Sequence, residues 1–124
     1  MKLYSILNPE FGEVFGKLMA CKALKGNVAF RLAKLAQKIK ENGDIYDKLR
    51  IAACEEYAEK DSEGKCIMEE NNYKIPAEKM PELNLKVQDM LNVDIEFAKI
   101  KMQDLENAEL SANDFMVIAE LIED

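Results

Sequence analysis

A long run of apolar residues at helical spacing dominates the first third of the chain. From residue 11 to residue 39, apolar or small residues recur every three or four positions, with Lys25 as the one interruption, which is the period of one face of an α-helix. These positions are Phe11, Val14, Leu18, Cys21, Val28, Leu32, Leu35 and Ile39. Asn8 can act as an N-cap and Pro9 suits the first helical position. The pattern therefore predicts a helix that starts at residue 9 and offers a narrow seam to a partner helix.

A turn is predicted where this helix reaches residues 41–44. Gly43 suits the left-handed position that follows many helix ends, and Asp44 is a preferred N-cap for the next helix. A glycine inside a helix costs roughly 1 kcal/mol, so Gly26 predicts a kink and not an end. One helix over 9–60 would be roughly 75 Å long, which is too long for a compact domain of this size. We therefore expect a helical hairpin over residues 9–60.

Shorter patterns flank the hairpin and predict a small sheet. Alternating or β-rich runs predict strands, and turn residues between two of them predict a β-hairpin. The predicted strands are 1–7, the two arms of a hairpin over 66–75, and 93–100, and the two further helices run from 76 to about 91 and from Ser111 onward. The expected fold is helix-rich α+β, a single domain over residues 1–124 in which a long helical hairpin packs with a small β-sheet and two further helices, both within 61–124.

The composition removes most familiar catalytic devices. The 124 residues include no His, so neither a Ser-His pair nor an imidazole metal ligand exists. Cys21, Cys54 and Cys66 are widely spaced, which predicts reduced, mostly buried thiols. Residues 61–64 resemble a calcium loop only faintly, because the later ligands do not follow. We expect a protein that is not an enzyme, with no catalytic residue, no metal and no cofactor.

Charge is sorted along the sequence, although the whole chain has a net charge of −7. Seven cations and no acid lie between Glu13 and Glu41. This block could form a face for a polyanion or for a partner, with the candidate residues Lys22, Lys25, Arg31, Lys34 and Lys38. In a hairpin folded at Gly43, however, residue 55 would lie opposite residue 31. The favoured interpretation is that the cations pair with Glu55, Glu56 and Glu59 of the same chain or form an ordinary solvated face.

The acids that follow offer the opposite hypothesis. Closely spaced carboxylates can imitate a run of phosphates and occupy the DNA-binding groove of another protein. The candidate acidic face consists of Glu55, Glu56, Glu59, Asp61 and Glu63. Ordinary surface acids that keep a small domain soluble explain the same pattern. Asp94 and Glu96 alternate with apolar residues on the last predicted strand, and we expect them to form a solvated outer face.

The order of these pieces resembles a family of small, functionally uncharacterised tailed-bacteriophage proteins. The resemblance is carried by the N-terminal strand, the Leu24-Lys25-Gly26 step in a basic helix, the segment 56–61 that runs into the turn 62–65, and the strand at Ile95-Glu96 followed by residues 104–111. It covers most of the chain and contains no catalytic signature. It implies an accessory protein made in the cytoplasm of the infected bacterium, and it transfers no active-site residue.

These observations lead to one functional hypothesis and two alternatives. The hypothesis is a non-enzymatic phage accessory protein that acts by protein–protein contact, in virion assembly or in interference with a host system. Because part of the apolar stripe of so long a hairpin stays uncovered, we expect self-association, most simply a dimer, and no membrane attachment. The alternatives are nucleic-acid binding by the face of residues 22–40 and inhibition of a host DNA-binding complex by the acidic face.

Overall fold

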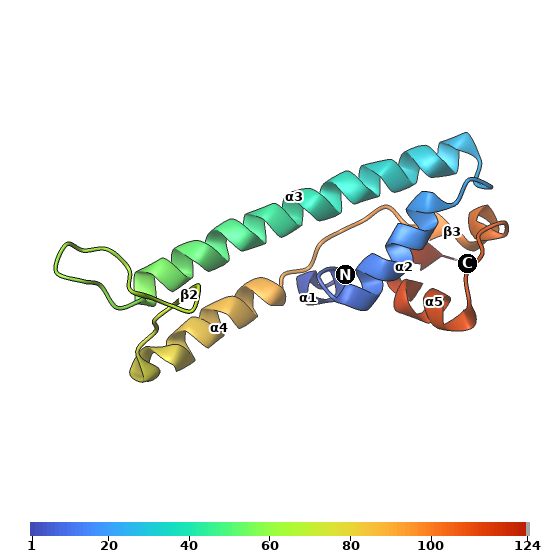
Figure 1. Ribbon diagram of the computed structural model, residues 1–124. Helices are drawn as coiled ribbons and strands as arrows, with labels where there is room; N and C mark the ends of the chain where they lie inside the picture. Colours follow the sequence, from blue (N-terminus) through green and yellow to red (C-terminus); the bar gives the residue numbers. More distant parts are fainter. Residues whose placement is uncertain (124) are drawn as a thin grey trace. The chain divides into compact units, whose positions relative to one another are not determined.

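The computed structural model describes residues 1–123 and confirms a helix-rich α+β fold (Figure 1). The chain forms two compact units, which are described separately. The terminal unit consists of the described residues of Met1–Asn42 and Val93–Asp124, and the central unit is Gly43–Asn92. Helix α3 (Gly26–Tyr57) contributes residues to both. The expected single-domain organisation stays a prediction.

The terminal unit contains nearly all of the buried apolar side chains. Its elements are α1 (Leu3–Ile6), α2 (Pro9–Ala20), the first part of α3, β3 (Ile100–Lys101), the 3₁₀ helix η2 (Met102–Leu105), α5 (Ala112–Val117), the 3₁₀ helix η3 (Ala119–Leu121) and β4 (Ile122–Glu123). The predicted helical seam is confirmed as the centre of this core. Leu18 of α2 and Leu32 of α3 are each only 1% exposed, and they share the core with Ile100, Leu105, Ile118 and Leu121.

The first helix does not kink at Gly26; it ends at Ala20 and a new helix begins at Gly26. The predicted start is confirmed, because Pro9 opens α2 and the side chain of Asn8 accepts a hydrogen bond from the Glu10 backbone N–H at 2.9 Å. Residues 21–25 connect the two helices. Gly26 has no side chain and disfavours a helix interior, and Asn27 prefers helix ends. Together they separate the predicted single helix into two helices. The connection between the two helices therefore lies about twenty residues before the predicted turn.

The predicted turn at residues 41–44 is wrong, because α3 continues through Gly43 (Figure 1). The side chain of Asn42 donates to the Lys38 carbonyl at 2.8 Å, which supports the helix where a break was expected. Gly43 does not have a positive φ, so it does not occupy the left-handed position of a helix end. The cost of one helical glycine, about 1 kcal/mol, is smaller than the packing energy of Leu32 alone. At 32 residues, α3 is about 48 Å long and not the 75 Å that argued for a turn.

The predicted N-terminal strand is also wrong, because Leu3–Ile6 form the short helix α1. Pairing is limited to the start of the chain: Lys2 forms an isolated antiparallel bridge with Asp94, and Met1 exchanges backbone hydrogen bonds with Ile95. Leu3 and Ile6 are both buried, and a spacing of three residues places them on one side of a helical turn. The pattern of residues 2–7 fits both the two-residue period of a strand and the period of a helix. The helix forms because it buries Leu3 and Ile6 on one side.

The strand predicted over 93–100 is reduced to β3, which consists of Ile100–Lys101. It pairs in parallel with β4 at the C-terminal end of the described chain, a partner that was not predicted. The start of the last helix is confirmed: Ser111 accepts from the Asp114 backbone N–H at 3.1 Å, and Asp114 accepts from the Ser111 backbone N–H at 3.1 Å. These two bonds form a capping box.

The central unit contains the second part of α3, a β-hairpin and a returning helix. Its remaining elements are β1 (Met68–Glu69), β2 (Asn72–Tyr73), the 3₁₀ helix η1 (Ala77–Lys79) and α4 (Met80–Leu91). The predicted hairpin and the helix that ends at Leu91 are confirmed. Glu70 and Asn71 have φ values of 48° and 70°, which is the conformation of a tight two-residue hairpin turn. The two strand pairs form separate two-stranded sheets, and not the single small sheet that was predicted.

Candidate interaction surfaces

The five predicted basic residues occupy two neighbouring segments of the terminal unit. Lys22 and Lys25 lie in the connection between α2 and α3, and both are exposed. Arg31, Lys34 and Lys38 lie on α3 at spacings of three and four residues, which places them on one face of the helix. The helix therefore places Arg31, Lys34 and Lys38 on one face, and the role of that face in binding stays a prediction.

The cations do not pair with Glu55, Glu56 and Glu59, so that expectation was wrong. The carboxylate beside Arg31 is Asp104 of η2, at 3.9 Å. Lys34 Nζ lies 5.1 Å from the centroid of the Phe30 ring. Lys38 donates to the backbone carbonyl of Glu96, and its Nζ lies 5.2 Å from the centroid of the Phe97 ring. Because the predicted turn at Gly43 does not form, no returning helix brings residue 55 opposite residue 31.

Phe30 is a member of this face that the sequence analysis missed. Its side chain lies on the solvent side of α3 and is 63% exposed. It precedes Lys34 by four residues, so the ring and the ammonium group meet on one side of the helix. The signal was present in the sequence: Phe30 is a large apolar residue that falls outside the three-and-four spacing of the predicted seam.

The predicted acidic residues are engaged with other residues of the central unit. Glu55 accepts from the Tyr73 hydroxyl at 2.9 Å, and this hydrogen bond raises the pKa of Tyr73. Glu56 Oε2 lies 2.9 Å from Lys86 Nζ, and Glu59 Oε2 lies 3.3 Å from Lys74 Nζ. The pKa of both lysines is raised, chiefly by these hydrogen bonds to glutamate.

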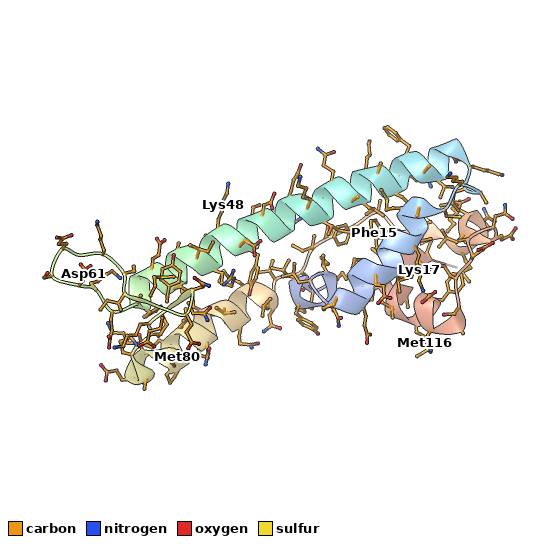
Figure 2. The ribbon with its side chains drawn as sticks, in the orientation of Figure 1. Phe15, Lys17, Lys48, Asp61, Met80 and Met116 are labelled. Carbon is orange, nitrogen blue, oxygen red and sulfur yellow. The ribbon has the colours of Figure 1, made fainter. Side chains whose placement is uncertain are left out.

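Asp61 and Glu63, the other two predicted acids, belong to a tight turn after α3 (Figure 2). Asp61 Oδ1 accepts from the backbone N–H groups of Glu63 at 2.8 Å and of Lys65 at 3.0 Å. Gly64 closes the turn with a φ of 81°. Glu63 also lies 3.9 Å from the Lys65 ammonium group. The five acids are thus spread over a helix end and a turn, and phosphate imitation stays a prediction.

The central unit presents large apolar side chains to solvent. Only Ala53, Ala58 and Leu83 of its apolar residues are buried. Leu49 is 52% exposed and Leu85 is 67% exposed. Other exposed members of the set are Ile45, Ile51, Met68 and Met80. Ile45 and Leu49 are four residues apart on α3, so they form one apolar patch on that helix.

Two ion pairs of the terminal unit are structural in character. Lys17 of α2 lies 3.2 Å from Asp114 of α5, whose oxygens also close the capping box (Figure 2). The backbone N–H of Ser111, followed by Lys17, holds the pKa of Asp114 below its ordinary value. Lys2 lies 3.1 Å from Asp94, beside the bridge that joins these two residues. The predicted outer-face acid Asp94 therefore has a cationic partner.

The cysteines and the loop that follows η2 show no assembled chemical site. All three thiols are half-buried and form no disulfide within residues 1–123, so the prediction of mostly buried cysteines is wrong, and that of reduced cysteines stays a prediction. Leu105, Leu110 and Phe115 line an open hollow of about 780 Å³ in the terminal unit. Within residues 1–123, no three His, Cys, Asp or Glu side chains gather where they could hold a metal ion. No helix in the same part of the chain is long and apolar enough to cross a bilayer.

Comparison with known proteins gives no relative. No protein-family model matches the chain, and neither a curated protein nor a solved structure matches it.

Proposed function

We propose that this chain is a non-enzymatic phage accessory protein that acts by protein–protein contact. It would be made in the cytoplasm of the infected bacterium and act in virion assembly or in interference with a host system. The assignment to a phage rests only on the sequence resemblance described above, and two of its pieces, the N-terminal strand and the strand at Ile95-Glu96, do not form. The mode of action is supported by the surface of the central unit.

The observation that carries the proposal is the exposure of apolar side chains on a unit with little core. The central unit spans about 50 residues, a size at which one hydrophobic core supplies little stability. Two of its three buried apolar side chains are the alanines Ala53 and Ala58, whereas Ile45 and Leu49 are 56% and 52% exposed. Burying a leucine or isoleucine side chain contributes about 1.5–3 kcal/mol. A partner that covers this patch would recover that energy.

A photo-crosslinking amino acid at Leu49, followed by mass spectrometry from infected cells, tests the proposal. The position next to it offers a matched control, because Lys48 projects from α3 into solvent (Figure 2). We expect covalent products from position 49 that position 48 does not give. The double substitution Ile45→Glu with Leu49→Glu should abolish the partner's recovery without unfolding the chain. Equal labelling from both positions would contradict the proposal.

Nucleic-acid binding is the second candidate, and the exposed Phe30 favours it. An aromatic ring beside Arg31, Lys34 and Lys38 combines a stacking surface with phosphate-binding charge. Titration of duplex and single-stranded DNA at two salt concentrations tests this function. Phosphate contacts predict an affinity that falls steeply as the salt concentration rises, and that is lost in a Lys34→Glu variant. Absence of binding at low salt would exclude this candidate.

A further inference from the structure

Two exposed helix faces on this chain carry opposite charge. The cationic face, on α3, consists of Arg31, Lys34 and Lys38 beside Phe30, which is 63% exposed. The anionic face, on α4, consists of Glu82 and Asp89, which flank Leu85 at spacings of three and four residues. Leu85 is 67% exposed. Each face therefore combines one large exposed apolar side chain with charges of a single sign, apart from Lys86, which lies between Glu82 and Asp89 on α4.

The charges of the anionic face are not neutralised by the described residues. Glu82 and Asp89 are exposed, and neither forms an ion pair within residues 1–123. The neighbouring Lys86 does not contribute, because its ammonium group pairs with Glu56 at 2.9 Å.

The cationic face is only partly engaged. Lys34 lies over the Phe30 ring, and Lys38 is bonded to a neutral carbonyl group, so neither lysine has a carboxylate at ion-pair distance in the described chain. The Arg31 side chain is 55% exposed, and its contact with Asp104, at 3.9 Å, is long for an ion pair. A second carboxylate can therefore approach each of these cations.

The spacing of the charges matches between the two faces. Arg31 and Lys38 are seven residues apart, and so are Glu82 and Asp89, which corresponds to about 10.5 Å along each helix. When two such helices lie side by side, both pairs of opposite charges meet at once, whether the helices run parallel or antiparallel. In either direction, Lys34 and Phe30 lie close to Leu85. The apolar contact and the two ion pairs therefore form in one register.

We propose that the cationic face of one copy of this chain docks on the anionic face of a second copy. This inference rests on the proposed function, since it names a partner for action by protein–protein contact. The contact is heterologous, because two different surfaces meet. Each copy in a docked pair still has one face of each sign, so the contact can close a reciprocal dimer or repeat into a larger assembly.

The expected strength follows from the small size of the contact. Two helix faces bury less than the roughly 800 Å² per partner of a standard interface. The ion pairs are exposed to solvent, so salt screens them. Self-association should therefore be reversible, should increase with protein concentration and should weaken as the salt concentration rises.

A charge-exchange experiment, read by sedimentation velocity over a concentration series, tests the inference. One variant carries Arg31→Glu, Lys34→Glu and Lys38→Glu, and the other carries Glu82→Lys and Asp89→Lys. In each variant both faces have the same sign, so each alone should associate about tenfold or more weakly than the unaltered chain. Mixed together, the two variants present opposite charges again. The mixture should regain association, and this outcome is possible only between different copies.

Matched controls separate this contact from a general effect of net charge. Lys22→Glu, Lys25→Glu and Lys40→Glu change the net charge as much as the first variant but lie off the cationic face. Asp44→Lys with Asp47→Lys does the same for the second variant. Both controls should associate like the unaltered chain. The pair Phe30→Ala and Leu85→Ala, which keeps every charge, should weaken association.

Three results would overturn self-docking. They are a monomer at every concentration at low salt, association that the controls weaken as much as the face variants, and a mixture that stays monomeric although circular dichroism shows both variants folded. A monomer that crosslinks another protein from position 49 would retain the proposed function and reject this partner. A monomer that binds DNA through the cationic face would contradict self-docking and would identify nucleic acid as the partner of that face.

Discussion

The two units of this chain use apolar residues in opposite ways. In the terminal unit, α2, the first part of α3, α5, η2 and η3 enclose a contiguous set of buried side chains that includes Leu18, Leu32 and Leu105, each 1% exposed. The central unit buries Leu83 and two alanines and leaves Leu49 and Leu85 in contact with solvent. It also carries solvent-exposed ion pairs, such as Glu56–Lys86 and Glu59–Lys74.

This difference shows that one continuous helix can serve a core at one end and a surface at the other. Val28, Leu32 and Leu35 of α3 are buried, whereas Ile45 and Leu49, farther along the same helix, are mostly exposed. Helix formation requires only backbone bonds and tolerable side chains, so it does not require the same burial on every turn. The terminal unit holds the large core, and the central unit leaves apolar side chains exposed.

The largest expected effect comes from removing a core side chain. Leu18→Ala should destabilise the protein by about 2–5 kcal/mol, because it deletes buried methyl groups and leaves a cavity in the terminal unit. Leu49→Ala, the same substitution at an exposed site, should change the free energy of unfolding by less than about 0.5 kcal/mol in the dilute protein. Urea unfolding measures both. Equal losses would break the distinction between the two units.

A smaller effect distinguishes the two glycines of the central unit. Gly64 has a φ of 81°, so Gly64→Ala should destabilise by about 1–2 kcal/mol, because an alanine in that conformation crowds its own backbone. Gly43 is helical, so Gly43→Ala should stabilise by about 1 kcal/mol. Thermal unfolding compares the two variants with the unaltered chain. A destabilised Gly43→Ala protein would indicate that the helix breaks at 41–44 after all.

The helix cap at Ser111 should contribute about as much to the free energy of unfolding as each of the two glycine substitutions changes it. Ser111→Ala removes the hydroxyl that accepts from the Asp114 backbone N–H and should cost about 1 kcal/mol. Ser111→Asp keeps an acceptor at that position and should retain more of the stability than alanine does. Ser62→Ala, in the exposed turn of the central unit, serves as a control and should change the stability very little. Denaturant unfolding of the three variants measures the order, and equal stability of all three would contradict the capping role.

The smallest expected effect is the change in the stability of each unit with pH. The pKa of Asp114 is lowered in the fold, so its contribution to the terminal unit is present above the pKa of the unfolded chain and is lost as the pH falls below about 4. The pKa values of Tyr73, Lys74 and Lys86 are raised, so their contributions to the central unit are present below about pH 10 and are lost as the pH rises further.

Acid should therefore weaken the terminal unit first, and alkali the central unit first. Amide signals assigned to each unit, followed by NMR through a pH titration, measure this difference. Asp114→Asn should flatten the acid response of the terminal unit without altering the alkaline response of the central unit. Simultaneous loss of both units at each extreme would contradict the assignment.

The sequence predicted those features that depend on neighbouring residues. The spacing of Leu18, Leu32 and Leu35 identified the core face, because burial on a helix repeats with the helical period. Ser111 with Asp114 identified a helix start, because a capping box requires only residues three apart. The β-hairpin over 66–75 was predicted for the same reason, since its turn is local.

The features that were missed depend on distant contacts or on a balance of small energies. β3 is defined by its pairing with β4, more than twenty residues later, and two residues carry no periodicity from which to infer that partner. Gly43 predicts a helix end from local preference alone. That preference does not include the contacts that hold α3 together before and after this residue. Of the candidate faces, the cations on α3 were predicted, but Phe30 was overlooked because it lies outside the apolar seam.

Hydrogen exchange along α3 tests the central claim most directly, because one helix passes through both units and serves as its own reference. In dilute protein, the amides of residues 29–39 should exchange much more slowly than those of residues 45–57, because only the former are attached to the large core. Uniform protection along the whole helix would mean that the central unit is as well packed as the terminal one. That result would contradict the proposal that the central unit keeps its apolar surface for another chain.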